Sequence, residues 1–146
     1  MTTNSNIYAF ARIAAMQEFS ERVEGNPSGI VLVVYAEPLG EAAKNALEKS
    51  FDAIGFGKAA CTFADVRDLP PDDVFTLVES LDPLALVAAD GTAAQACADA
   101  ARQPFPLQRK ARFFGREARA FNHLNAMFET DADKQAVWHL LKTMAQ

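Results

Sequence analysis

The run IVLVVYA at residues 30–36 restricts the fold more than any other stretch. Its unbroken apolar character and its β-branched side chains predict a strand that is buried on both faces, as in parallel sheets covered by helices. Residues 59–66 and 83–89 have a similar character and predict two more strands. A fourth strand is predicted as the second arm of a hairpin over 111–122 that turns near Gly115.

Helical patterns lie between and after these strands. Apolar residues three or four positions apart predict helices over 41–54 and 72–81. A small-residue helix follows the third strand, with Asp90 or Thr92 as its capping residue. A terminal helix is predicted to start near Thr130 and to bury four apolar residues, namely Val137, Leu140, Leu141 and Met144.

Strand and helix therefore alternate along the chain, which is typical of an open sheet with helices on both faces. The expected fold class is α/β: a three-layer α/β/α sandwich with a mostly parallel four-stranded sheet. Apolar residues between Ile7 and Val23 recur at roughly helical spacing before the glycines and proline of EGNPSG. Residues 1–28 are therefore predicted as an N-terminal helical extension, and residues 29–146 as the α/β domain of a single globular unit.

Charge and cysteine content limit the partners and the compartment. A net charge of −5 at pH 7 argues against a general nucleic-acid binder, although a local basic patch is compatible with it. Cys61 and Cys97 share no metal-ligand spacing and lie among apolar residues, as small core side chains do. Two cysteines and no hydrophobic leader predict a cytoplasmic protein, and the apolar runs are too short to cross a bilayer.

Polar residues follow each predicted strand: Glu37, Asp65, Asp90 and His123. Ligands of open parallel sheets bind at the carboxyl ends of the strands, so these residues form the candidate site. All four side chains are polar enough to take part in chemistry. The alternative is structural: the aspartates form turns or cap helices, Glu37 is a solvated turn residue, and His123 bonds a backbone carbonyl.

No cofactor or metal is expected. The loop EPLGEAAKN has one glycine where a phosphate cradle needs several, and no G-x-S-x-G nucleophile motif is present. His123 and His139 lack further ligands at zinc-binding spacing.

The segment RKARFFGREAR is a local basic and aromatic cluster. Its cationic residues are Arg109, Lys110, Arg112, Arg116 and Arg119. Such a mixture suits contact with a nucleic acid or an acidic protein. A solvated hairpin with two core phenylalanines explains the same residues.

Three segments, in order, resemble the uracil-DNA glycosylase superfamily, especially its iron–sulfur-bearing bacterial and archaeal branch. GEAAKNALEKSFDAIGFGKAACTFADV is similar to a glycine-started helix, its IG stop and the strand after it. LVESLDPLALVAADGTAAQACADA is similar to the next helix, strand and helix start, with matches at Thr92, Ala93 and Ala94. FNHLNAMFETDADKQAVWHLLKTM looks like the H-P-S motif and the K-x-x-V-W-x-x-L helix, with matches at His123, Lys134, Val137, Trp138 and Leu141.

The resemblance covers roughly residues 30–144 and implies a role for each candidate. Active members flip a uracil into a pocket at these strand ends. His123 matches the histidine that stabilises the departing uracil anion, Glu37 stands in for the group that positions water, and Asp65 matches the base-reading asparagine. The chain departs from the family at HLN for H-P-S, at a shortened first loop, and at Asp65, which lacks the donor that uracil needs. The four cluster cysteines are absent, so no iron–sulfur centre is expected.

The chain has an expected N-terminal helical arm, a short loop after the first strand and a terminal helix with an aromatic residue at Trp138. This organisation resembles the psi subunit of bacterial DNA polymerase III, a family relative without enzyme activity. The expected function is therefore a catalytically inactive binding or assembly module in DNA replication or repair, with a protein or DNA as its partner and no membrane contact. The alternative is an atypical DNA glycosylase or small-substrate hydrolase that uses Glu37 or Asp65 and His123. A flavodoxin-like binding module is a third class, which the glycine-poor loops disfavour. If Trp138 is a core anchor, its replacement by alanine costs about 3–5 kcal/mol.

Overall fold

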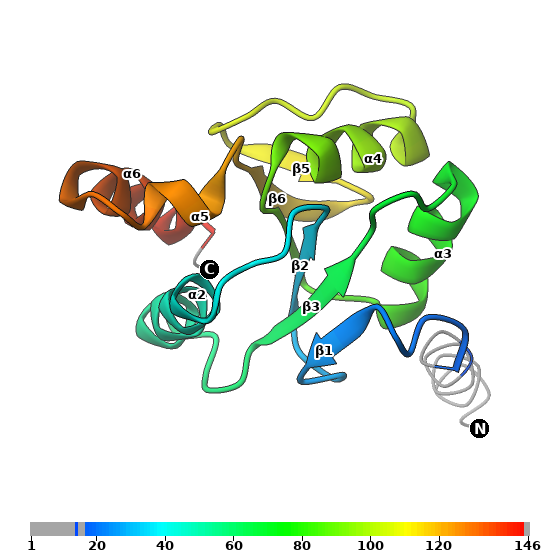
Figure 1. Ribbon diagram of the computed structural model, residues 1–146, viewed down its shortest axis with the longest axis horizontal. Coiled ribbons are helices and arrows are strands. Elements are labelled where there is room, and N and C mark those ends of the chain that lie inside the picture. Colours follow the sequence, from blue (N-terminus) through cyan, green and yellow to red (C-terminus); the bar gives the residue numbers. More distant parts are fainter. Residues whose placement is uncertain (1–13, 15–16, 145–146) are drawn as a thin grey trace.

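The computed structural model describes residue 14 and residues 17–144, so the predicted helix pattern at Ile7 and Phe10 lies outside the described residues. In the described part, six strands form one mixed sheet in the order β1-β3-β2-β4-β6-β5 (Figure 1). The strands are β1 (Val23–Gly25), β2 (Val31–Tyr35), β3 (Cys61–Asp65), β4 (Ala85–Ala88), β5 (Ala111–Phe113) and β6 (Arg116–Ala120).

The four parallel strands are the predicted ones: β3, β2, β4 and β6 pair in that order. The predicted hairpin is also present, with β5 antiparallel to β6 and a turn at Gly115. Two antiparallel strands, β1 and β5, flank the parallel strands, so the described sheet is six-stranded and mixed rather than four-stranded.

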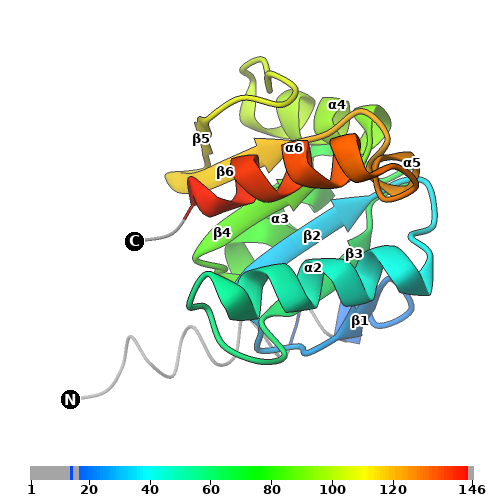
Figure 2. The ribbon, with the colours of Figure 1, turned by 90° about the vertical axis from the view of Figure 1, so that its left-hand side faces the viewer.

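Helices cover both faces of the sheet (Figures 1 and 2). They are α2 (Glu41–Ala53), α3 (Pro71–Leu81), α4 (Gly91–Ala101), α5 (Leu124–Met127) and α6 (Asp131–Lys142). Helices α3 and α4 pack on one face, and α2, α5 and α6 pack on the other. None of the helices described between residues 17 and 144 is long and apolar enough to span a bilayer.

The unbroken apolar run of β2 is explained by the two covered faces. Leu32 and Val34 pack toward α3 and α4, whereas Val31 and Val33 pack toward α2 and α6. Successive side chains of a strand point to opposite faces, so a strand buried on both sides must be apolar at every position. All five residues of β2 are buried accordingly.

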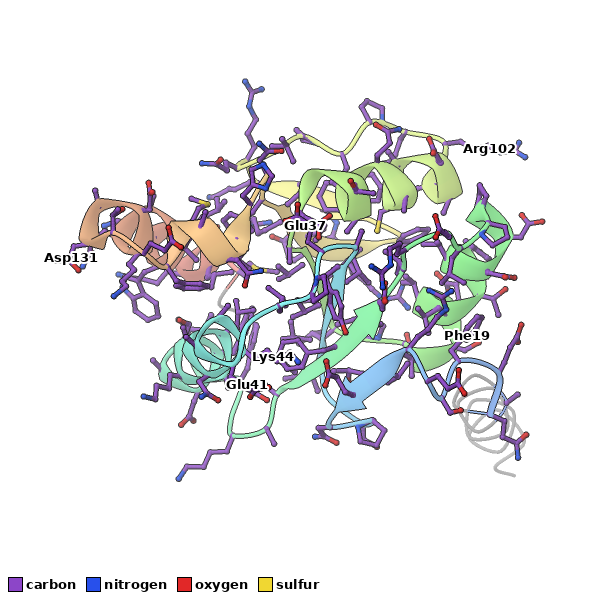
Figure 3. All side chains as sticks on the ribbon, viewed as in Figure 1. Phe19, Glu37, Glu41, Lys44, Arg102 and Asp131 are labelled. Atoms are coloured by element: carbon purple, nitrogen blue, oxygen red, sulfur yellow. The ribbon has the colours of Figure 1, made fainter. Side chains whose placement is uncertain are left out.

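The described part of the segment before residue 29 is helical at residues 14, 17 and 18, and the chain after them joins the sheet. Val23, expected in the N-terminal helix, lies in β1, which pairs with β3. Phe19 is buried in the core on the side of α3 (Figure 3). The backbone N–H of Asp65 donates to the carbonyl of Arg22, which fixes the chain along the edge of β3. Phe19 and β1 therefore belong to the core and the sheet.

The terminal helix α6 buries Val137 and Leu141, and Met144 is buried just beyond it. Trp138 is only half-buried, and the Nζ of Lys142 lies 5.7 Å from the centre of its ring. The expectation that Trp138 anchors the core is therefore wrong. It lies one position past Val137, on the flank of the helix rather than on the stripe that faces the sheet.

Candidate functional site at the carboxyl ends of the strands

Asp90 is the central residue of the carboxyl rim, which we define as the loops after β2, β3, β4 and β6. Its carboxylate is buried and accepts three backbone hydrogen bonds. Oδ2 accepts from the N–H groups of Ala36 and Glu37 at 2.8 and 2.9 Å, and Oδ1 accepts from Ala93 at 2.8 Å. The last bond caps the N-terminus of α4, so Asp90, one of the two predicted capping residues, is the one that caps. One side chain therefore joins the loop after β2 to the start of α4.

Asn125 holds the same loop from the other side. Its Oδ1 accepts from the N–H of Gly40 at 3.0 Å, and its Nδ2 donates to the carbonyl of Pro38 at 2.8 Å. Both bonds span more than eighty residues of sequence, because α5 follows β6 while Pro38 follows β2. The loop over residues 36–40 is thus bonded at both ends.

Backbone bonds join the loops after β4 and β6 directly. The N–H of Gly91 donates to the carbonyl of Asn122 at 3.0 Å, and the N–H of Leu124 donates to the carbonyl of Ala89 at 2.9 Å. Asp90 and His123 form an isolated antiparallel bridge between these bonds. Three strand ends are therefore tied together by main-chain and side-chain bonds.

Glu37 and His123 are brought together, as the rule for strand ends predicted. The Nδ1 of His123 lies 3.6 Å from the Oε2 of Glu37, and the two side chains are 58% and 60% exposed. Glu37 lies on the loop after β2 (Figure 3). His123 stands at the start of α5 without a side-chain capping bond. The pair forms an open carboxylate–imidazole contact on the surface.

Asp65 lies apart from this pair. Its Oδ1 accepts from the N–H of Arg67 at 2.9 Å, and its Oδ2 lies 3.3 Å from the guanidinium of the same residue. This is the turn-forming role that aspartate often has two residues before a bonded amide. Three strand spacings of about 4.8 Å separate β3 from β6, so Asp65 and His123 are roughly 14 Å apart across the rim.

A hollow of about 700 Å³ lies along α4 and the segment after it, rather than at the Glu37–His123 pair. Its lining includes Ala94, Ala98, Phe105 and Leu107. Neither Glu37, Asp65 nor His123 lines it. An acid–base pair exposed to water gains little from desolvation, which is what strengthens such pairs in enclosed active sites.

The basic cluster separates into exposed and internally bonded residues. Arg109 and Lys110 are exposed. Arg112 bonds Glu117 at 3.0 Å, and Arg116 bonds Glu79 at 3.1 Å and Asp82 at 2.7 Å. Three of the five cations therefore have carboxylate partners within the protein, since Arg119 also bonds Glu117 at 3.1 Å.

Arg119 corrects the expectation of a surface contact, because its side chain is 0% exposed. Its guanidinium donates to Thr143 Oγ1, Glu117 and the carbonyls of Ala111 and Ala118. It thereby fastens the end of α6 to the hairpin. Burial raises the pKa of Glu117, but its bonds and attraction to Arg119 and Arg112 outweigh burial, so the pKa is lowered overall.

The two cysteines are buried, as predicted. Burial raises the pKa of Cys97 to about 12, and burial together with the nearby Glu48 carboxylate also raises the pKa of Cys61. Among the residues that the structure describes, no group of three or more His, Cys, Asp and Glu side chains is arranged to hold a metal ion.

Asn125 and Thr143 are the residues at these sites that sequence reasoning missed. Both act through short polar side chains on partners far away in sequence. No periodicity or motif marks such positions, and only the order of the strands brings the partners together. A scan against protein-family models finds no match, and neither does a search of curated proteins.

Proposed function

We propose that the protein is a catalytically inactive member of the uracil-DNA glycosylase-like superfamily that serves as a binding or assembly module, with a role in DNA replication or repair. The family part of this proposal is supported by the three sequence segments that resemble the superfamily. The inactive part is supported by one observation on the carboxyl rim: the buried carboxylate of Asp90 bonds the amides of Ala36, Glu37 and Ala93.

Asp90 lies where ligands bind in open α/β sheets. Strand β2 leads through α2 to β3 on one side, and β4 leads through α4 to β6 on the other side. The strand order therefore reverses between β2 and β4, and the crevice at such a reversal is where open α/β sheets bind ligands. Loop amides and a helix N-terminus are the donors that hold an anionic ligand there. In this protein an internal carboxylate uses them.

The remaining candidates add to the argument for an inactive rim. Asp65 is engaged by Arg67, and Glu37 with His123 is open to water. A glycosylase must enclose a flipped base and read its edge by hydrogen bonds. The loop that would form that enclosure is instead held against the protein by Asn125.

Incubation with uracil-containing single-stranded DNA tests the proposal. We expect no release of uracil above that of a buffer control, measured by chromatography of the free base, while an active uracil-DNA glycosylase serves as the positive control. Base release that disappears in the His123→Ala variant would contradict the proposal.

One observation favours the second candidate, an atypical glycosylase or small-substrate hydrolase: the 3.6 Å distance between His123 and Glu37. In that mechanism the Glu37 carboxylate activates a water and the imidazole stabilises the leaving group. The same assay with other damaged bases distinguishes the candidates. Activity lost in both Glu37→Gln and His123→Ala, but kept in the exposed control variant Asp99→Asn, would establish the second candidate.

A further inference from the structure

The exposed side of α3 and the neighbouring tip of the β5–β6 hairpin form one surface, which we call the α3 face. It comprises Asp72, Phe75, Glu79 and Asp82 with Phe114 and Leu84. The hairpin tip reaches toward α3 in the ribbon (Figure 1). The rings of Phe75 and Phe114 meet edge to face with their centres 5.9 Å apart, which joins the two elements.

Phe75 and Phe114 form an aromatic pair in which Phe75 is exposed and Phe114 is half-buried, packed also against Phe113 and the core. Phe75 is 48% exposed in the middle of α3. Phe114 has φ 52° and Gly115 has φ 77°, so both lie in the left-handed region at the hairpin turn. Two-residue turns of this kind favour Asn or Gly at the first position, and a bulky residue there costs on the order of 1 kcal/mol. The sequence nevertheless has a phenylalanine whose ring stands against an exposed phenylalanine.

The apolar surface continues beyond this pair. Arg116 bonds the carbonyls of both Phe114 and Pro83, so the hairpin tip and the residue before Leu84 adjoin one another. Leu84 donates its backbone N–H to Ile30 at the amino end of β2. Four large apolar side chains are exposed in the described part of the chain: Ile30, Phe75, Leu84 and Leu107. The backbone at Leu84 therefore adjoins both the hairpin tip and Ile30.

The negative charge of the α3 face lies on α3 itself. At the hairpin tip Arg112 is 65% exposed, donates to the carbonyl of Gly115 at 2.7 Å and is paired with Glu117 at 3.0 Å. Arg116 bonds Glu79 and Asp82, but its side chain is only 11% exposed, whereas theirs are 43% and 53% exposed. The cation thus lies behind the carboxylates. Asp72 adds an exposed carboxylate one turn before Phe75, and no lysine or arginine occurs in α3. Phosphates would be repelled by such a face, whereas cationic side chains would be attracted to it.

We propose that the α3 face docks a basic segment of a partner protein, in which an apolar side chain packs on Phe75 and Phe114 while flanking lysines or arginines pair with the carboxylates. The inference rests on the proposed function, since it names the binding surface and the kind of partner for an assembly module. Aromatic side chains dominate the energy of protein interfaces, and peripheral charges mainly set orientation and association rate.

Backbone amide NMR of the full chain tests this inference. The probe is a synthetic amphipathic peptide of leucine and lysine, about 14 residues long so that a helix is within reach. We expect saturable shift changes at α3 and at residues 113–116, which weaken as salt is raised. The same peptide with glutamate in place of lysine is expected to leave these amides unmoved.

Matched variants locate the contact. Phe75→Ser is expected to weaken peptide binding by about tenfold or more, as for a buried aromatic anchor. Leu107→Ser, which removes an exposed apolar side chain on a different surface, is expected to change affinity by less than about twofold. Asp72→Lys reverses a charge and keeps both aromatic residues, and it is expected to weaken peptide binding at low salt. This variant tests the role of charge even if Phe75→Ser unfolds the chain.

Shift changes spread evenly over the surface, equal binding of the glutamate peptide, or equal effects of Phe75→Ser and Leu107→Ser would overturn the docking proposal. These outcomes are separable from failure of the proposed function. Base release from uracil-containing DNA would contradict the inactive module and leave the peptide result unaffected. Absence of peptide binding without base release would remove the docking proposal alone.

Discussion

Replacement of Asp90 by asparagine is the sharpest test of how the carboxyl rim is held. The substitution keeps the size of the side chain but leaves one acceptor oxygen for three backbone donors. The new amide nitrogen must face either Ala93 or the amides of Ala36 and Glu37. A hydrogen bond to a charged group contributes about 1.5–3 kcal/mol, and a helix cap contributes about 0.5–2 kcal/mol. Glu37 is exposed, so water can replace part of the bond that its amide loses. We therefore expect a net loss of about 2–4 kcal/mol in unfolding free energy.

Urea unfolding followed by far-UV circular dichroism measures this loss. Thermal unfolding should show a corresponding decrease in Tm, roughly 6–12 °C for a chain of this size. Asp99→Asn is the matched control, because Asp99 is exposed on α4 and accepts only from Gln95 among the described side-chain bonds. Hydrogen exchange should also quicken at the amides of Ala36 and Glu37. An Asp90→Asn protein as stable as the control, within about 0.5 kcal/mol, would refute the reasoning about the rim.

Three further results are expected. Arg119→Met should cost about 1.5–3 kcal/mol in urea unfolding because it removes the bonds from a buried guanidinium to Thr143 and Glu117, although Glu117 keeps its bond to Arg112. Arg112→Met on the surface should cost less than about 1 kcal/mol, and equal costs would contradict the burial of Arg119. Glu117→Gln should destabilise the protein near neutral pH in urea unfolding. The deficit should shrink as pH falls below the unfolded value of about 4.3 and be lost only below the lowered folded-state pKa, because a lowered folded-state pKa contributes stability above the unfolded value and loses it as pH falls. Cys61 and Cys97 should react with a thiol reagent near pH 8 only after unfolding, since burial raises the pKa of both; rapid labelling of the native protein would contradict this.

The parallel strands and long helices could be predicted because each carries its own pattern. The apolar run of β2 and the stripes of α2 and α3 place these elements within one or two residues of their observed bounds. Strand β1 could not be predicted in this way. Val23–Gly25 has no strand pattern of its own, and its conformation is set by pairing with β3, almost forty residues later.

The candidate site was predictable in part for a related reason. The rule for strand ends places Glu37 and His123 on one rim, and they do meet. The order of the strands cannot be read from their patterns, and that order separates Asp65 from His123. From the sequence alone, Arg119 looks like an exposed cation of the hairpin. In the structure it is buried and bonds Thr143 at the end of α6. Charge in a short strand therefore indicates exposure only where no other element packs on that face.

The borders of the sheet have a consequence for how another molecule can attach. Each outermost strand, β1 and β5, contains three residues and ends at or next to a residue with positive φ. Strands this short offer few free backbone groups for pairing, and the backbone leaves the sheet edge directly after them. Strand addition, by which many proteins recruit peptides or aggregate, therefore has little template here. A neighbouring chain must recognise side chains and surface shape, so specificity depends on individual residues that mutation can alter one at a time.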